Sequence, residues 1–524
     1  IRSRILVMLS NKKYDAIIFT DMRGYIIQQK AAGAYNIASH LRQNNYSVKV
    51  IDNFVWLLRN HKEKLFTYME NHIGSNTLFI GFSTTFMSLF NTLGKTHQKI
   101  AMKGLSNYTI NKENSVTNLK EFMIFLRSKF SHVKIIIGGQ EKSTHLFFKE
   151  YDIDCWIKGL AENSIIKFID NIKQGKEILS VVDDPFAENY NFHDRGPIFD
   201  ATDIVFQNEV LPIEMSRGCR FKCKFCSYPL LGRKPSDEYI RSEESIYKEL
   251  LHNYEHFGTT QYHITCDTFN ETTDKLERVK RAIDRLGVKI NFWAYLRLEL
   301  LHAFPEQLEL LKEMGIVQAT FGIETLNDKS AKIIGKGFGR ENVLKQLRKI
   351  KECWGENVRL HSGFIIGLPY DTKETVEEWM SIIINRETAL DTINLNPLYI
   401  VPDRLLGKTS RVYFSEFDLN YDKYGYIKTK DGWINDDWTY NEASEYASKA
   451  WKQFEQNGDF LDNKYRSAPH AVALMNTRVI NPQITWPDIV VPKPNMKESN
   501  LWLKEIKTIK DGIYKKYAEN VFAS

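Results

Sequence analysis

The sequence predicts an α/β protein with an N-terminal doubly wound, Rossmann-like domain, a partial (βα)6 barrel of the TIM type and an α-rich C-terminal region. Twice along the chain, short continuous apolar runs alternate with helical patterns, which is typical of parallel sheets covered by helices on both faces. A stretch without clear periodicity, containing Pro197 and several Asp and Asn residues, separates the two series. The expected boundaries are 1–185 for the first domain, 186–210 for a linker, 211–399 for the barrel and 400–524 for a capping or substrate region.

The first domain is expected to contain strands at 15–20, 46–52, 77–83 and 133–139 and helices at 31–44 and 119–130. The polar residues 95–118 predict a long loop or a partly helical insertion. Ligands of such sheets bind beyond the carboxyl ends of the strands. Small residues that let a ligand approach the backbone lie at these ends: Ser83, Thr85, Gly138 and Gly139. The same residue types are common in turns, so a ligand site and simple turns are both compatible with the pattern.

The barrel is expected to contain six strands, at 211–216, 261–266, 289–297, 317–323, 358–366 and 392–399. Helical patterns separate them, at 242–255, 273–286, 305–314, about 324–354 and 373–389. Sites in barrels of this kind lie at the carboxyl ends of the strands. The aromatic-rich residues 400–524 are expected to close this mouth.

Three of the six cysteines follow the first barrel strand in a C-x3-C-x2-C pattern: Cys219, Cys223 and Cys226. Three thiolates this close cannot all pair as disulfides, but they can converge on one metal centre. Structural zinc usually takes four protein ligands, and the loop offers no fourth Cys or His. A [4Fe–4S] cluster with one iron left open suits three cysteines, since most four-iron clusters have four. A zinc knuckle is the alternative.

Charged residues end the next barrel strands: Asp267, Arg297 and Glu324. A carboxylate can receive an ammonium group or ribose hydroxyls, and an Arg fork can clamp a carboxylate. Phe225, just before the third cysteine, is placed to lie against an aromatic base. Each charged residue is also compatible with a solvated turn, but several in register with the barrel period favour a pocket for one small molecule.

The cysteine pattern resembles the signature of radical S-adenosylmethionine (SAM) enzymes, and Gly322–Glu324 and Gly363–Pro369 resemble later strand motifs of that superfamily. The resemblance implies a [4Fe–4S] cluster whose open iron is chelated by the amine and carboxylate of SAM. It also implies reductive cleavage to a 5′-deoxyadenosyl radical and an electron donor such as flavodoxin or ferredoxin. By analogy, Asp267 would contact the methionyl amine, Arg297 the carboxylate and Glu324 the ribose. Asp267 stands where many members have Gly-Gly-Glu.

The first domain is similar in layout to the cobalamin-binding domain that precedes the barrel in one radical SAM class. Ser83–Thr85 resembles its Ser-x-Thr element, Gly138-Gly139 its Gly-Gly element, and Asp154–Glu162 the segment that ends in Gly-Glu-Gly-Glu, with two positions different. Asp21-Met22-Arg23 departs from the Asp-x-His element that supplies a lower ligand. The resemblance therefore implies cobalamin without a His ligand, or a domain that has lost cobalamin and serves as scaffold.

Three functions follow from these patterns. The first is a cobalamin-dependent methyltransferase acting on an unactivated carbon, in which methylcobalamin supplies the methyl group and a second SAM recharges it. The second is a radical SAM rearrangement, cyclisation or oxidation without cobalamin. The third is a non-catalytic iron–sulfur or zinc protein that binds nucleic acid through a basic run that is equally compatible with a solvated loop: Arg217, Arg220, Lys222, Lys224, Arg233, Lys234 and Arg241.

The composition is ordinary for a globular protein with ample core: 524 residues, 43% of them hydrophobic, with a net charge of +6. No apolar run approaches the roughly 18 residues needed to span a bilayer. Clustered cysteines indicate a reducing compartment, so we expect a cytoplasmic protein without a signal peptide, acting on a small-molecule or nucleotide-type substrate. Packing roles are expected for the other cysteines and two strand histidines: Cys155, Cys266, Cys353, His263 and His361.

Overall fold

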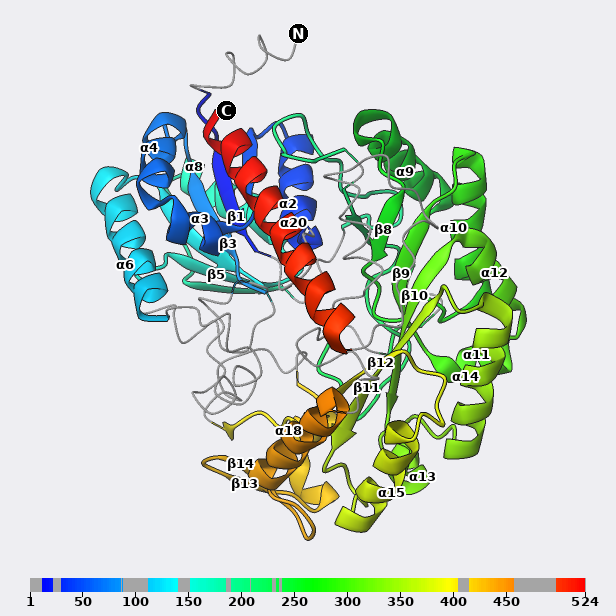
Figure 1. Ribbon diagram of the computed structural model, residues 1–524. Helices are drawn as coiled ribbons and strands as arrows, with labels where there is room; N and C mark the ends of the chain where they lie inside the picture. The colour runs from blue at the N-terminus through cyan, green and yellow to red at the C-terminus, as the bar shows by residue number, and fades with distance from the viewer. Residues whose placement is uncertain are drawn as a thin grey trace.

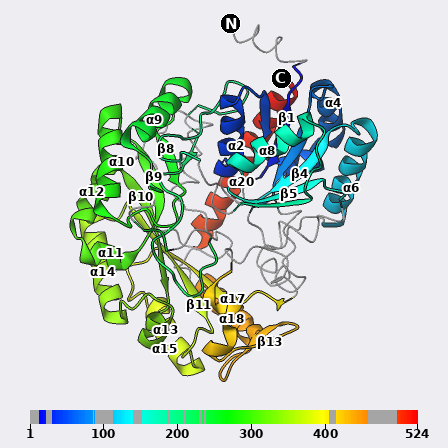
Figure 2. The ribbon, with the colours of Figure 1, turned by 180° about the vertical axis from the view of Figure 1, so that it is seen from behind.

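The computed structural model describes residues 12–21, 30–85, 87, 112–139, 151–184, 190–207, 209–228, 232–234, 238–403, 414–456 and 496–523. Met22, Arg23 and most of the expected 95–118 insertion lie outside these residues. Two six-stranded parallel sheets form the two predicted α/β units, which lie side by side in Figures 1 and 2. The predicted fold class is confirmed.

The N-terminal sheet has the strand order β2-β1-β3-β4-β5-β6. This is the flavodoxin-like arrangement, in which ligands bind at the switch point between β1 and β3. Its strands are β1 (Ala16–Thr20), β2 (Val48–Ile51), β3 (Phe79–Ser83), β4 (Lys134–Gly138), β5 (Cys155–Gly159) and β6 (Val181–Asp184). Its helices are α2 (Ala32–Gln43), α3 (Phe54–Asn60), α4 (Lys62–His72), α6 (Lys112–Lys129) and α8 (Glu162–Lys173).

Alternate residues of these strands pack on opposite faces of the sheet, as the period of two requires. Ile18 belongs to the apolar core shared with α2 and α8, whereas Ile17 and Phe19 belong to the core shared with α3, α4 and α6. The α2–α8 core is continuous with the barrel core. The two units are therefore joined by apolar packing as well as by the chain.

The barrel sheet runs in sequential order, β12-β11-β10-β9-β8-β7, and is open between its two edges. Its strands are β7 (Leu211–Ile213), β8 (Gln261–Ile264), β9 (Asn291–Leu296), β10 (Ile316–Glu324), β11 (Arg359–Ile366) and β12 (Thr392–Pro397). Its helices are α9 (Glu243–Phe257), α10 (Thr273–Leu286), α11 (Leu298–Ala303), α12 (Glu306–Met314), α13 (Asp328–Ile333), α14 (Arg340–Trp354) and α15 (Lys373–Ile384). Capping residues define the ends of α9 and α10. The side chains of Ser242 and Thr272 accept hydrogen bonds from backbone N–H groups as N-caps, and Gly258 and Gly287 are C-caps in the left-handed conformation.

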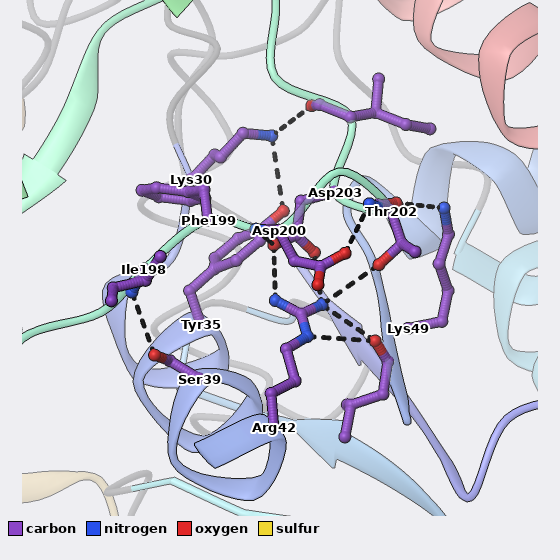
Figure 3. A network of polar contacts seen from close by, with 12 residues as sticks. Lys30, Tyr35, Ser39, Arg42, Lys49, Ile198, Phe199, Asp200, Thr202 and Asp203 are labelled. Atoms are coloured by element: carbon purple, nitrogen blue, oxygen red, sulfur yellow. Dashed lines mark hydrogen bonds and ion pairs between the residues drawn. The ribbon is translucent and has the colours of Figure 1, made fainter. Parts of the chain in front are cut away.

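The segment predicted to be a linker packs against the N-terminal domain (Figure 3). Both terminal nitrogens of Arg42 donate to the Asp203 carboxylate, at 2.7 and 2.8 Å, and Lys49 Nζ donates to the Thr202 carbonyl at 2.5 Å. Burial lowers the pKa of Lys49 to about 8. The segment is fixed because buried side chains of α2 and β2 satisfy its polar groups.

The C-terminal region divides between the two units. Residues 414–456 form α17 (Glu416–Leu419), the 3-10 helix η3 (Tyr421–Tyr424), β13 (Ile427–Thr429), β14 (Gly432–Ile434) and α18 (Tyr440–Gln456). They pack on the barrel, where Trp433 Nε1 donates to the Leu398 carbonyl at 2.7 Å and Tyr426 OH to the Gly367 carbonyl at 2.7 Å.

The last helix, α20 (Met496–Ala523), packs against the N-terminal domain and runs across it in Figure 1. The Asp52 backbone N–H donates to Tyr517 OH at 2.7 Å. The expectation that all of 400–524 caps the barrel therefore does not hold for α20, because its apolar face packs on the core formed by α3 and α4. Among the described residues, no helix is both long and apolar enough to cross a lipid bilayer.

Candidate functional site

The cysteine loop leaves the carboxyl end of β7 and is held from two sides. The Lys224 N–H donates to the Ile334 carbonyl at 3.1 Å, and the Lys224 carbonyl accepts from the Phe417 N–H at 3.1 Å. Within the loop, the Cys226 N–H donates to the Cys223 carbonyl at 3.1 Å. The loop is therefore fixed by the barrel on one side and by α17 on the other.

All three predicted cysteines line one cavity of about 260 Å³, which we call the cluster cavity. The Cys219 thiol lies 3.3 Å from Thr268 Oγ1, and the Cys223 thiol accepts from Arg297 Nη1 at 3.2 Å. Burial raises the pKa of Cys226 to about 12, so this thiol needs a metal to become a ligand thiolate at neutral pH.

Among the described residues, no three His, Cys, Asp or Glu side chains are gathered closely enough to hold a single metal ion. A mononuclear zinc site would require that arrangement. An iron–sulfur cluster places its own irons and sulfides between the thiolates, and three cysteines around one cavity fit such a group.

The cluster cavity is also lined by Phe225, Asp267, Arg297 and Glu324, the four residues predicted to surround a cofactor. Further lining residues were not predicted as site residues: Phe221, Tyr295, Lys336, His361 and Asn394. Tyr295 and His361 precede Arg297 and Gly363 by two residues on β9 and β11. Alternate residues of a strand share a face, so the spacing of two could have predicted that Tyr295 and His361 also face the cavity.

Arg297 is held at the cavity wall by its backbone and its guanidinium. Asn270 accepts from the Arg297 N–H at 2.9 Å and donates to its carbonyl at 3.1 Å. The guanidinium lies 3.9 Å from the centre of the Phe221 ring, and its Nε donates to Glu299 at 2.6 Å. Glu299 and Cys223 thus occupy the donors that would clamp a ligand carboxylate.

Glu324 ends β10 in a left-handed backbone conformation, with φ of +71°. The pairing register with β11 shifts between Phe321 and Glu324, and such irregularities re-aim side chains near functional sites. Burial raises the pKa of the Glu324 carboxyl to about 7, and Lys336 opposes this effect. A Cβ at Gly322 would lie 2.8 Å from Glu324 Oε1, so a larger residue there would displace this carboxylate from its observed position.

Asp267 follows β8, and burial raises the pKa of its carboxyl to about 6. In the described part of the chain, no hydrogen bond to this carboxylate is formed, which leaves it able to receive a ligand group. Asp267 and Tyr228 line the cluster cavity and also a second cavity, of about 350 Å³. These two residues therefore stand at the junction of the two spaces.

The second cavity, which we call the inter-domain cavity, lies between the carboxyl edge of the N-terminal sheet and the barrel mouth. The N-terminal sheet contributes all four predicted residues, Ser83, Thr85, Gly138 and Gly139. Gly139 has φ of +124°, and a Cβ there would lie 2.8 Å from Thr85 Oγ1. The carboxyl end of the Asp154–Glu162 segment also lines this cavity, through 159–162.

The other cysteines and His263 have packing environments. The Cys266 thiol accepts from the Met215 N–H at 3.3 Å, Cys155 is buried in β5, and Cys353 donates to Glu309 at 3.1 Å. His263 stacks on Trp293 with ring centres 3.7 Å apart. His361 lines the cluster cavity, and its Nδ1 contacts Thr392 Oγ1 at 2.8 Å, so its packing role stays a prediction.

The barrel matches a known family. Residues 213–383 match the model of the radical SAM superfamily. The barrel is a radical SAM domain. This segment contains the cysteine loop, Asp267, Arg297 and Glu324, which were assigned from the sequence pattern.

An uncharacterized methyltransferase of Pyrococcus horikoshii is 26% identical over 268 residues, which are 47% of this chain and 56% of that protein. The match therefore spans just over half the length of that curated relative. The radical SAM methyltransferase TsrM from Kitasatospora setae, solved with tryptophan substrate and a SAM analogue bound, is 14% identical, with a TM-score of 0.56 over 96% of this chain and 99% of TsrM.

OxsB, a cobalamin-dependent radical SAM enzyme solved with aqua-cobalamin and SAM bound, is 15% identical, with a TM-score of 0.53 over 97% of this chain and 80% of OxsB. At these identities the two likenesses show a shared fold. They extend that fold from the radical SAM domain to nearly the whole chain, including the N-terminal sheet.

Proposed function

We propose that this protein cleaves SAM reductively and uses the resulting radical in a cobalamin-dependent methylation of an unactivated carbon. The observation that supports the first step is the convergence of Cys219, Cys223 and Cys226 on one cavity with charged strand-end side chains. A [4Fe–4S] cluster bound there would supply one electron to SAM, releasing methionine and a 5′-deoxyadenosyl radical that removes a substrate hydrogen.

In this proposal, each side chain around the cluster cavity binds a different group of SAM. Asp267, whose carboxylate forms no hydrogen bond to the described residues, receives the methionyl ammonium. Arg297 exchanges Glu299 for the methionyl carboxylate, and Glu324 accepts from the ribose hydroxyls. Phe225 provides an apolar surface for the adenine.

The inter-domain cavity supports the cobalamin part of the proposal. Its rim of Ser83, Thr85, Gly138 and Gly139 lets a flat ligand approach the backbone, and Gly139 leaves no room for a side chain. Among the described residues that line it, there is no histidine, so the corrinoid would be held without a histidine ligand from them. Cobalamin bound there would carry the methyl group to a substrate at the Tyr228–Asp267 junction.

The experiment that tests both parts compares wild-type protein with Cys223→Ala after anaerobic reconstitution with iron and sulfide. Wild type should bind close to four irons, give an electron paramagnetic resonance signal on reduction that changes when SAM is added, and retain added aquacobalamin. Cys223→Ala should lose the signal and its response to SAM but keep aquacobalamin. Cys353→Ala, a cysteine outside both cavities, is the matched control and should behave as wild type.

Two results would contradict parts of the proposal separately. If the electron paramagnetic resonance signal of the wild-type cluster does not change when SAM is added, SAM does not bind at the open iron. Wild-type protein that responds to SAM but never retains aquacobalamin would contradict the methyltransferase and favour a radical SAM rearrangement, cyclisation or oxidation.

Only part of the basic run lies on the surface. Arg217 and Arg241 are buried in ion pairs with Glu162 and Glu249, so these two members are not surface charges. Arg220, Lys222 and Lys234 are exposed around the cysteine loop. We propose that they attract an acidic one-electron donor such as flavodoxin or ferredoxin, whose rate of cluster reduction should fall steeply with added salt.

A further inference from the structure

A buried ion-pair network, which we call the Arg217 bridge, joins the N-terminal domain to the cysteine loop. It consists of Asn36, Glu162, Glu214 and Arg217. Arg217 Nη2 lies 2.6 Å from Glu162 Oε1, and the guanidinium also donates twice to the Glu214 carboxylate, at 3.1 Å each. Asn36 Nδ2 donates to the same Glu214 carboxylate at 2.9 Å. Two N-terminal helices, α2 and α8, thus meet the end of β7.

The Arg217–Glu162 pair of the bridge is buried, whereas the Glu214 side chain is 19% exposed. The side chains of Arg217 and Glu162 are 7% and 2% exposed, and the guanidinium lies 4.6 Å from the centre of the Phe192 ring. Buried charges are retained only when each is paired, and removal of one partner leaves an uncompensated charge. The relative position of α8 and Arg217 is therefore sharply determined.

The two ends of the bridge lie at the two proposed cofactor sites. Glu162 opens α8, directly after the segment 159–161 that lines the inter-domain cavity. Arg217 lies two residues before Cys219, and its N–H donates to the Tyr239 carbonyl at 3.0 Å. All four bridge residues line the inter-domain cavity themselves. A ligand in that cavity meets the same side chains that position the start of the cysteine loop.

We infer that Arg217 is a positioning residue that couples occupancy of the inter-domain cavity to SAM binding at the cluster. This inference rests on the proposed function, because it takes a corrinoid and SAM as the two ligands. A corrinoid that packs against the bridge fixes α8 against the barrel, and the loop that carries Cys219 is then held in the geometry that SAM needs. Coupling between two binding sites is reciprocal, so each ligand must tighten the other by the same factor.

The test measures the dissociation constant of SAM by anaerobic equilibrium dialysis of reconstituted protein, with and without saturating aquacobalamin. In wild type, aquacobalamin should lower the dissociation constant of SAM by at least about five-fold, which is the lower end of typical coupling. SAM should lower the dissociation constant of aquacobalamin by the same factor, which absorbance titration measures. In Glu162→Gln, the dissociation constant of each ligand alone serves as that variant's own reference, and the factor by which one ligand changes the other should fall towards one. Glu214→Gln, which loosens the guanidinium from the barrel side, is the second variant and should also reduce the factor.

Asp203→Asn is the matched control, because it removes the carboxylate of a different buried ion pair, Arg42–Asp203, and neither of these residues lines either cavity. It should keep the wild-type factor. A wild-type factor of one, or an unchanged factor in both bridge variants, would overturn the inference while leaving the proposed function intact. Failure of wild type to bind aquacobalamin or SAM alone would instead contradict the proposed function, and the inference with it.

Discussion

Gly138 and Gly139 are adjacent in sequence but differ in what their backbones tolerate. Gly139 lies at φ +124°, where a Cβ would be 2.8 Å from Thr85 Oγ1 and 2.9 Å from the Thr85 nitrogen. A Cβ at Gly138 would meet only the Ile157 carbonyl oxygen, at an ordinary 3.7 Å. The glycine pair therefore contains one residue that the turn at the cavity rim requires and one that it does not.

Gly139→Ala should lower the free energy of unfolding of the N-terminal domain by about 1–3 kcal/mol, because alanine is strained at this φ and crowds Thr85. Gly138→Ala should change it by less than about 1 kcal/mol. Urea unfolding followed by circular dichroism measures both. Equal destabilisation by the two substitutions would contradict this account of the rim.

Glu324 predicts a pH dependence of SAM affinity. Burial raises the pKa of its carboxyl to about 7, so the acceptor form is lost as the pH falls through 7. If the ribose hydroxyls donate to the carboxylate, SAM affinity should fall between pH 8 and 6.5, with a limiting slope of about ten-fold per pH unit at the acid end. Glu324→Gln should bind more weakly at pH 8 and lose this slope. If Glu324→Gln keeps the wild-type pH profile of SAM affinity, the proposed role of Glu324 in binding the ribose is wrong.

At the residue scale, the sequence allowed prediction that the three cysteines, Asp267, Arg297 and Glu324 lie around one cavity, because strand ends and their order can be read from apolar runs. Their roles as ligands stay predictions. It did not allow prediction of Lys336 or Asn394 as cavity residues. Lys336 follows α13 in a loop without periodicity, and the inward direction of Asn394 depends on its pairing with Gly363.

Elements that pair locally were predicted better than elements that pack at long range. All six barrel strands lie where apolar runs indicated them. The 186–210 segment was predicted as a linker because it has no clear periodicity and contains Pro, Asp and Asn residues. Its packing could not be predicted, because it depends on buried Arg42 and Lys49, whose residue types are usually exposed. The place of α20 depends on which surface its apolar face covers, and no local pattern contains that information.

Lys49 predicts a stability change at high pH. Burial holds its pKa at about 8, below the usual 10.5, so the unfolded chain binds more protons between pH 8 and 10.5. Its contribution to the free energy of unfolding should therefore rise with pH in this window, by up to about 1.4 kcal/mol per unit. In Lys49→Met this contribution is absent, so the difference between wild type and variant should shift in favour of wild type as the pH rises.

Denaturant unfolding of both proteins between pH 6 and 10 measures that difference. It should be constant below about pH 7, where Lys49 is charged in both folded and unfolded wild type, and change above pH 8. A difference that stays constant across the whole range would show that Lys49 keeps an ordinary pKa.

For the whole molecule, the arrangement of two cavities with a shared wall is the central feature. Tyr228 and Asp267 belong to both, and the Arg217 bridge ties the inter-domain cavity to the loop that carries Cys219. The order of the domains was predictable from two series of strands and helices. Their mutual placement was not, because it depends on the core that α2 and α8 share with the barrel and on buried pairs such as Glu162–Arg217.

The most direct test of the account is whether the reduced, reconstituted protein converts SAM to 5′-deoxyadenosine and methionine, measured by liquid chromatography and mass spectrometry under anaerobic conditions. Wild type and Cys353→Ala should both form 5′-deoxyadenosine, and Cys223→Ala should form at least about 100-fold less, since removal of a thiolate removes the electron source. Absence of 5′-deoxyadenosine from wild type with an intact cluster, or equal amounts from Cys223→Ala, would contradict it.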